Sequence, residues 1–450
     1  MSSIKNLHSP MNICNRLYLS YLCLFCITYL LFFTNTPSWY ETILPIMMWM
    51  IGFLFNNIFL KDSNKSLFVP VFFFQIISIF IMVCVNNYAY HEPLGPNAID
   101  SLRYRWLGEV HGGKSYLEFL YWIITVYGVN YDDIGYPTII WLSYNLFGKY
   151  GSEALLFLNA VIVAWGSVLF YKLSSNFVSP RYARMIALLW GCMPFAVYQA
   201  STGLKENFFL FFVVCSFFYL YNYYKRKLIV DFFLAVLFCL FLFLFRLACG
   251  YMALLSLLSV FFVRAHFVKR NLKLLISIVF VIGLLLFPII VGRIGEQRGI
   301  TYDHLVHKSD MKTESGGTAM YIANGISGTI GPIPSFASND ELKRNYMPRY
   351  SFTLYVKLIV SFFFWYSLCY FIRIRDLKAL PLIIFSLLDI LMVIFSYFAL
   401  QIRMQWPHIP FFFLLATIGY LNYKKNRLNN TIFHIYLLFS FVLVLLYNIR

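Results

Sequence analysis

Charged side chains are scarce in this chain: only 12% of its 450 residues are Asp, Glu, Lys or Arg, and the acids number just 19. Soluble domains carry about a quarter charged residues, so this scarcity excludes an ordinary soluble protein. It also excludes a disordered chain and a nucleic-acid-binding domain, because both depend on many charges. We expect no cleavable signal peptide, since the first apolar run, at about 17–34, is too long and lacks a small-residue cleavage site.

Cysteines are also few, and they show no pairing pattern. Seven of the nine lie within apolar runs, where a thiol behaves as a small hydrophobe. The one CxxC, Cys23 to Cys26, falls inside the first apolar run and has no second pair. The cysteines therefore indicate neither a zinc site nor a redox motif nor a secreted disulfide scaffold.

Apolar side chains are abundant instead: 60% of the residues are hydrophobic, 20% are aromatic, and the mean hydropathy is +0.70. This composition predicts an all-α, polytopic membrane bundle that forms one membrane domain over 1–450. We also expect a short half-helix at the membrane surface, from Pro137 to Phe147. About thirteen membrane spans are predicted, at 17–34, 43–60, 67–87, 153–171, 185–202, 206–223, 228–245, 247–263, 274–292, 353–372, 379–400, 408–422 and 431–448.

The distribution of basic residues predicts the orientation. With the N-terminus in the cytoplasm, the cytoplasmic segments hold twenty Lys and Arg against three acids, which accounts for the whole net charge of +17. The positive-inside rule favours this arrangement, so the pI of 9.4 reports topology and not a nucleic-acid partner. Two long polar segments, about 86–152 and 293–352, then lie on the periplasmic side. We expect the chemistry there.

Three acids in the first of these segments are candidate catalytic residues, and Glu206 is a fourth. Asp100 directly follows a predicted span, and a carboxylate in partly dehydrated surroundings can act as a general base. The competing interpretation is a solvated acid paired with Arg103 or Arg105. Asp132 and Asp133 precede the short half-helix, where they either hold a divalent cation with a diphosphate or cap the helix.

A Lys–Glu pair, Lys205 and Glu206, is squeezed between two predicted spans in the turn Gly203–Asn207. Such a pair is costly in a membrane unless it faces a wet cavity, so Lys205 is a candidate phosphate ligand and Glu206 a candidate orienting or proton-transferring acid. An ordinary interfacial ion pair that ends two helices is the alternative.

A set of cationic side chains on the same predicted side could bind a lipid-linked phosphate, because arginine forks bind phosphate through two hydrogen bonds. Snorkelling to lipid headgroups competes with this interpretation for each residue taken singly. Asp389 is the one acid in the middle of a predicted span, where a functional and a buried hydrogen-bonded role both remain open. The candidate phosphate-binding residues are Arg103, Lys205, Arg246, Arg293, Arg298, Arg349, Arg403 and His408.

The order of these features resembles the GT-C superfamily of polyprenyl-linked glycosyltransferases. A span is followed by an Asp-bearing loop, a G-Y-P-x-x-x-x-L-x-x-x-L-F-G half-helix, two spans joined by a basic turn, Pro194, the STGLKEN turn and a late R-x-x-x-P-x-x-P segment from Arg403. The resemblance is best over about 100–206. It implies that Asp100 is the catalytic base, although Asp100 lacks the usual acidic neighbour and an acidic pair stands at 132–133 instead.

A looser likeness connects the chain with the Wzy-type O-antigen polymerases, which have many spans and large periplasmic loops. Together these resemblances imply a glycosyltransferase of a bacterial inner membrane that uses an undecaprenyl-(di)phosphate-linked glycan at the periplasmic face. Polymerisation of O-antigen repeat units in lipopolysaccharide biosynthesis is the expected reaction. A single-sugar transferase and a flippase for lipid-linked oligosaccharide are the alternatives. Expected partners are the lipid-linked glycan, membrane lipids and a chain-length regulator, with no nucleic acid.

Overall fold

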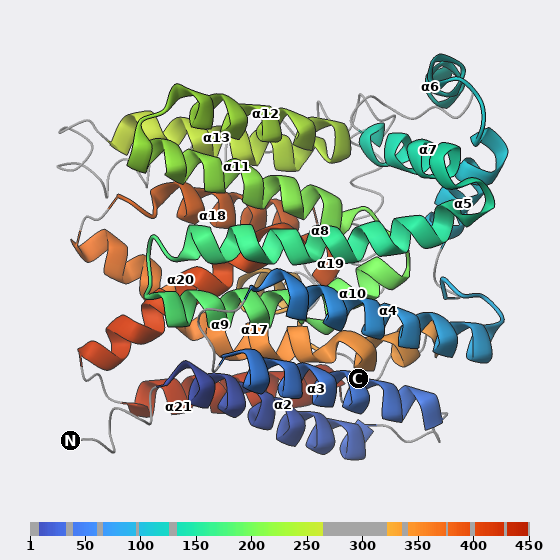
Figure 1. The fold of residues 1–450 in the computed structure, drawn as a ribbon. Helices are drawn as coiled ribbons and strands as arrows, with labels where there is room; N and C mark the ends of the chain where they lie inside the picture. The colour runs from blue at the N-terminus through green and yellow to red at the C-terminus, as the bar shows by residue number, and fades with distance from the viewer. Residues whose placement is uncertain are drawn as a thin grey trace. The chain divides into compact units, whose positions relative to one another are not determined.

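The structure is a computed structural model that describes residues 9–32, 39–60, 66–95, 99–125, 133–263, 322–334, 341–374, 377–396, 401–426 and 430–448. Most of these residues are helical, as the sequence predicts, and Figure 1 shows the helices in order along the chain. The helices are α2 (Pro10–Phe32), α3 (Trp39–Leu60), α4 (Phe68–Tyr90), α5 (Ile99–His111), α6 (Tyr116–Thr125), α7 (Gly135–Phe147), α8 (Gly151–Ser174), α9 (Pro180–Gly191), α10 (Pro194–Ser201), α11 (Glu206–Arg226), α12 (Ile229–Phe245), α13 (Leu247–Val263), α17 (Glu341–Ile374), α18 (Leu380–Phe395), α19 (Ile402–Gln405), α20 (Ile409–Lys425) and α21 (Asn430–Asn448), with 3-10 helices η2 (Gly148–Tyr150) and η3 (Trp406–His408).

Six stretches of the described helices are long and apolar enough to cross a membrane. Three shorter apolar helices, at 229–245, 247–259 and 380–395, accompany them. The protein is therefore a multi-pass helical membrane protein. The number of thirteen spans stays a prediction, and the predicted span at 274–292 lies outside the described residues. The six stretches are Ile43–Leu60, Phe68–Tyr90, Gly135–Ser174, Glu206–Arg226, Arg349–Ile374 and Asn430–Asn448.

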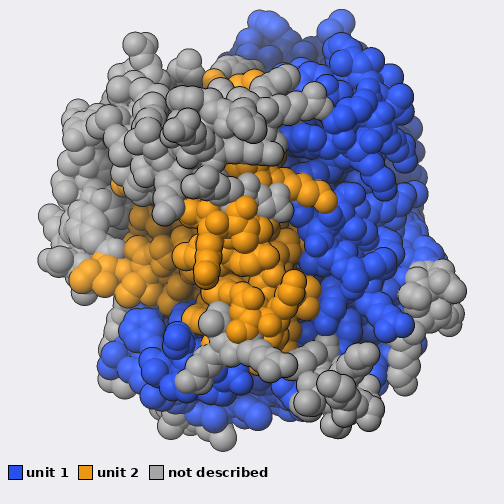
Figure 2. Space-filling model, turned by 90° about the vertical axis from the view of Figure 1, so that its left-hand side faces the viewer, with its two compact units in different colours: residues 1–250, 333–360, 429–450 blue, residues 251–332, 361–428 orange. Residues whose placement is uncertain are grey.

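The chain divides into two compact units, which Figure 2 shows in different colours. Unit 1 comprises Met1–Gly250, Ile333–Val360 and Asn429–Arg450, and unit 2 comprises Tyr251–Pro332 and Ser361–Leu428. Each unit is thus assembled from segments that are far apart in the sequence. The expectation of a single membrane domain over the whole chain stays a prediction.

In unit 1, α8 is the central helix. It packs against α4, α9 and α11, and α11 in turn forms a hairpin with α12. Buried small residues such as Ala160 and Ala164 line α8, and small side chains let neighbouring helices approach closely inside a membrane. The short helix α7, expected from the sequence, packs on both α5 and α8. Its predicted position at the membrane surface stays a prediction.

The predicted span at 185–202 is not one helix. It is broken into α9 and α10 at Cys192 and Met193, because Met193 precedes Pro194 and is extended, with φ −71° and ψ 133°. A residue before proline is driven out of the helical region, and the proline then starts the next helix. The break delivers α10, only eight residues long, to the polar turn that precedes α11.

Candidate functional site

The candidate site in unit 1 is built around Tyr104, one helical turn after Asp100 on α5. The ring of Tyr104 meets the ring of Tyr136 edge-on, with 4.8 Å between centroids. Burial, followed by the nearby carboxylates of Asp133, Glu206 and Asp100, raises the pKa of the Tyr104 phenol well above its ordinary value. The phenol therefore stays protonated and can act as a hydrogen-bond donor among three acids. Asp100 itself lies in the first turn of α5, where a helix favours a negative charge.

Lys205 and Asp133 form a direct ion pair across this site. Lys205 stands between α10 and α11, and Asp133 immediately precedes α7, 72 residues earlier in the sequence. The side chain of Lys205 is 13% exposed and that of Asp133 is 42% exposed, so the pair opens toward solvent on the Asp133 side. The structure thus joins two of the predicted site residues that the sequence could only place on separate segments.

The turn between α10 and α11 is held in place by Tyr136. Its hydroxyl donates to the carbonyl of Gly203 over 2.5 Å, and its ring packs edge-on against Phe208 at 5.3 Å. Gly203 has a φ of +65°, a conformation that favours glycine and lets the chain reverse here. This contact fixes the beginning of α7 against the turn that carries Lys205 and Glu206.

Arg246 lies at the end of α12, in an extended conformation between α12 and α13. Its guanidinium stands 5.6 Å from the ring centroid of Phe209, which is on the first turn of α11 after Glu206. On the same side, a Cβ on Gly135 would come within 2.6 Å of the ring of Phe245. Close packing of α7, α11 and α12 therefore brings Arg246 to the end of unit 1 that holds Lys205.

Buried amides support this arrangement. Asn207 donates to the carbonyl of Ala196 over 3.1 Å and to Asn159 over 3.4 Å, and both asparagines are almost fully buried. Sequence reasoning missed Tyr104, Tyr136 and Asn159. A signal was present for Asn159, because a lone amide inside an apolar run must find a polar partner.

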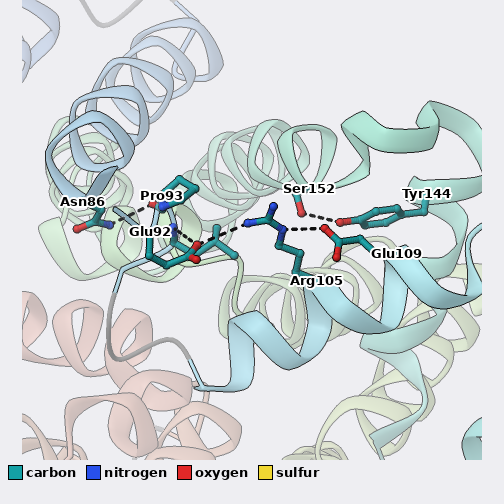
Figure 3. A network of polar contacts seen from close by, with 8 residues as sticks. Asn86, Glu92, Pro93, Arg105, Glu109, Tyr144 and Ser152 are labelled. Atoms are coloured by element: carbon teal, nitrogen blue, oxygen red, sulfur yellow. Dashed lines mark hydrogen bonds and ion pairs between the residues drawn. The ribbon is translucent and has the colours of Figure 1, made fainter. Parts of the chain in front are cut away.

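Arg105 does not pair with Asp100 in the described contacts. Figure 3 shows its guanidinium between two other acids, at 2.9 Å from Glu109 and 3.6 Å from Glu92. The hydrogen bond that Arg105 donates to Glu109 raises the pKa of Arg105, and the charges of Glu109 and Glu92 raise it further. Arg103 lies on the exposed side of α5. Arg105 thus ties the loop after α4 to α5.

Arg349 is another predicted phosphate ligand, and it is 1% exposed. Its Nη1 donates to the side-chain oxygen of Asn86 over 2.6 Å, and its guanidinium lies 5.8 Å from the ring of Tyr90. Asn86 in turn donates to the carbonyl of Pro93, as Figure 3 also shows. Arg349 therefore anchors α17 to the last turns of α4.

Unit 2 contains the remaining described candidates. The His408 ring nitrogen Nδ1 is 2.6 Å from a carboxylate oxygen of Asp389, and both side chains are almost completely buried. Arg403 is half-buried on α19, and Gln405 donates to the carbonyl of Ser327 over 2.8 Å. The sequence named His408 and Asp389 separately, whereas the structure shows them as a hydrogen-bonded pair.

Asp132, Arg293 and Arg298 lie outside the described residues. Within the described part of the chain, no group of three or more His, Cys, Asp or Glu could hold a metal ion. Asp133, the described half of the acidic pair, is in contact with Lys205 instead. The divalent cation at 132–133 stays a prediction.

Comparisons with protein-family models, with curated proteins and with solved structures find no match. The sequence and the structure together show a multi-pass helical membrane protein whose first unit brings three acids, a lysine and a tyrosine together.

Proposed function

We propose that the protein is a membrane-embedded, GT-C-type glycosyltransferase that uses a sugar or oligosaccharide on an undecaprenyl-(di)phosphate carrier, and that it polymerises O-antigen repeat units. The observation that carries the proposal is the gathering of Asp100, Asp133 and Glu206 around Tyr104, with Lys205 paired to Asp133. Glycosyl transfer needs a base for the acceptor hydroxyl and a cation for the departing phosphate. Both kinds of group meet here.

In the proposed reaction, the acceptor hydroxyl attacks the anomeric carbon of the donor sugar. The proton of the hydroxyl passes to the carboxylate of Asp100, and the bond between the anomeric carbon and the phosphate oxygen breaks. The leaving undecaprenyl-(di)phosphate keeps the electron pair of that bond. Its growing negative charge is stabilised by Lys205 and Arg246.

Lys205 must share its charge in this mechanism, because Asp133 already binds it. Arrival of the phosphate gives the ammonium group a second anionic partner, and an ammonium has three protons to donate. Tyr104 is suited to donate its phenol hydrogen to a sugar or phosphate oxygen, since its raised pKa keeps that hydrogen in place. We place the reaction at the periplasmic face of a bacterial inner membrane, with membrane lipids and a chain-length regulator as partners.

Two other functions remain to be distinguished from polymerisation. A single-sugar transferase would use the same acid and cation with a polyprenyl-phosphate-monosaccharide. A flippase is favoured by one observation, the discontinuous helix formed by α9 and α10, because broken helices are typical of transporter binding sites.

The test uses the purified full chain in liposomes with an undecaprenyl-diphosphate-linked repeat unit, and measures glycan length on gels. Asp100→Asn should lower extension by about 10²-fold or more at normal protein levels, because it removes a general base while keeping size. Glu118→Gln is the matched control. Glu118 is exposed on α6, where it caps the helix start by accepting from Ser115, and glutamine can do the same.

Full activity in Asp100→Asn together with loss in Asp133→Asn or Glu206→Gln would assign the base to the other acid. Addition of a single residue by the wild type, with no extension, would indicate the single-sugar transferase. Movement of the carrier across the bilayer without any new glycosidic bond would replace the proposal by the flippase.

A further inference from the structure

The turn between α10 and α11 is polar and yet buried. In the turn and in the helix ends beside it, five polar side chains are at most 3% exposed: those of Gln199, Ser201, Thr202, Glu206 and Asn207. Local hydrogen bonds satisfy several of them. The hydroxyls of Ser201 and Thr202 both donate to the carbonyl of Tyr198, over 3.1 and 2.8 Å, and Asn207 is held as described above.

Gln199 differs from Ser201, Thr202 and Asn207. Its side chain is 0% exposed, and neither its amide nitrogen nor its amide oxygen has a hydrogen-bond partner in the structure. Its backbone carbonyl, by contrast, accepts from the Leu204 backbone N–H over 3.1 Å and so closes the turn. Burying an amide without partners costs free energy, and such a group calls for a missing water or ligand.

A second buried glutamine shows what a structural role looks like in the same unit. Gln75 on α4 is also 0% exposed, and its Nε2 donates to the carbonyl of Gly191 over 2.7 Å, at the end of α9, while its Oε1 has no hydrogen-bond partner. Gln75 therefore links α4 to the break between α9 and α10. The side chain of Gln199, on α10, forms no such link between helices.

The chemistry of the amide restricts what can bind it. Nε2 offers donors and Oε1 offers an acceptor, so a ligand that satisfies both must itself accept and donate. A phosphate only accepts hydrogen bonds, so it would leave Oε1 without a partner. A metal cation binds only electron-pair donors, so it would leave the Nε2 hydrogens without a partner. A hydroxyl group does both. The fitting ligands are a sugar hydroxyl and a water molecule.

The position of Gln199 favours the sugar. Asn207 reaches the carbonyl of Ala196, three residues before Gln199, so α11 packs against the turn of α10 that carries Gln199. Lys205, the proposed phosphate ligand, follows in the same turn and is fixed through the Leu204 bond to Gln199. In a carrier-linked glycan, the first sugar is bonded directly to the phosphate.

We propose that Gln199 is a specificity residue that binds a hydroxyl group of the sugar next to the carrier phosphate. This inference rests on the proposed function, because it takes Lys205 as the phosphate ligand. The amide has no hydrogen-bond partner within the protein, and the sugar supplies both the donor and the acceptor. A site that is built to hydrogen-bond a substrate hydroxyl discriminates strongly against a ligand that lacks it.

The experiment compares the wild type with Gln199→Leu, purified as the full chain in nanodiscs. Thermal unfolding is measured without ligand, and dissociation constants are measured for undecaprenyl diphosphate and for undecaprenyl-diphosphate-N-acetylglucosamine. We expect Gln199→Leu to be at least as stable as the wild type, since it removes two unpaired polar atoms. Its affinity for the sugar-bearing carrier should fall about tenfold, the value for two lost hydrogen bonds, while its affinity for the bare carrier stays unchanged.

Gln75→Leu is the matched control. It should be less stable than the wild type, because the Gly191 carbonyl loses its donor, and it should keep the wild-type preference for the sugar-bearing carrier. Three outcomes would overturn the inference alone: Gln199→Leu keeps that preference, the wild type binds both carriers equally, or Gln199→Leu is strongly destabilised without ligand, which would indicate a permanently bound water. If the wild type binds neither carrier, the proposed function fails and the inference fails with it.

Discussion

Arg403 is half-buried on α19. Two residues later a buried run begins at Gln405 and continues through Trp406. If its guanidinium binds a lipid-linked phosphate, the planar fork matters and lysine is a poor substitute. We expect Arg403→Lys to lose much of the glycan-extension activity and Arg403→Ala nearly all of it, measured at equal protein levels. A fully active lysine variant would show that Arg403 only anchors the chain at bulk headgroups.

His111, the last residue of α5, gives the protein a pH-dependent stability. Its ring is 2% exposed and lies 3.9 Å from the ring centroid of Trp122, and neither ring nitrogen has a hydrogen-bond partner. Burial, and then the charge of Lys114, lowers the pKa of His111. The folded protein therefore binds the proton less readily than the unfolded chain.

Stability should consequently fall as the pH drops below about 6.5, the ordinary pKa of histidine, and level off below the lowered folded-state pKa. His111→Phe keeps an aromatic ring against Trp122 and removes the titration, so its melting temperature should change less between pH 7 and pH 5. His434→Phe, at an exposed position on α21, is the control and should melt with the wild-type pH dependence. Equal pH dependence in His111→Phe and the wild type would contradict the prediction.

At the scale of elements, the crossing of α17 and α20 in unit 2 depends on Gly419. A Cβ at this position would fall well inside contact distance of the backbone carbonyl of Phe363, which cannot rotate away. We expect Gly419→Ala to lower the unfolding free energy by about 1–3 kcal/mol, the usual cost of overpacking, in thermal or denaturant unfolding.

Gly325 provides the comparison, because it lies in the helical stretch 322–329 and a Cβ there would meet no atom within 4 Å. Gly325→Ala should be neutral or stabilising by up to about 1 kcal/mol, since alanine is the better helix former. Equal effects of the two substitutions would mean that helix propensity, and not the close approach of α17 and α20, explains the loss.

At the scale of the whole molecule, the charge distribution predicts the orientation. An impermeant thiol reagent is added on the periplasmic side. Single cysteines placed at Arg226 and Lys425 should be protected from it, and one placed at Lys312 should react, because basic connections stay in the cytoplasm. All nine native cysteines are free, so they can be replaced without breaking a disulfide. If the cysteine at position 312 is labelled only from the cytoplasmic side, the proposed placement of the reaction at the periplasmic face is wrong.

Composition and local patterning determined a large part of this protein. The apolar runs fix a helical membrane protein, because only internal hydrogen bonding satisfies the backbone in lipid and each run is long enough to form it locally. The short helix α7 also follows from its own sequence. The break between α9 and α10 follows from the Met193–Pro194 dipeptide, although both residues lie within one apolar run.

Only the tertiary structure decided which polar groups meet. The pairing of Lys205 with Asp133, of Arg349 with Asn86 and of His408 with Asp389 joins positions 72, 263 and 19 residues apart. No periodicity within one helix encodes such pairs, because they depend on which helix faces pack against each other. The unpartnered amide of Gln199 is likewise invisible in the sequence, which only places this residue within the predicted span 185–202. Its burial follows from the packing of α10 among α4, α8 and α11.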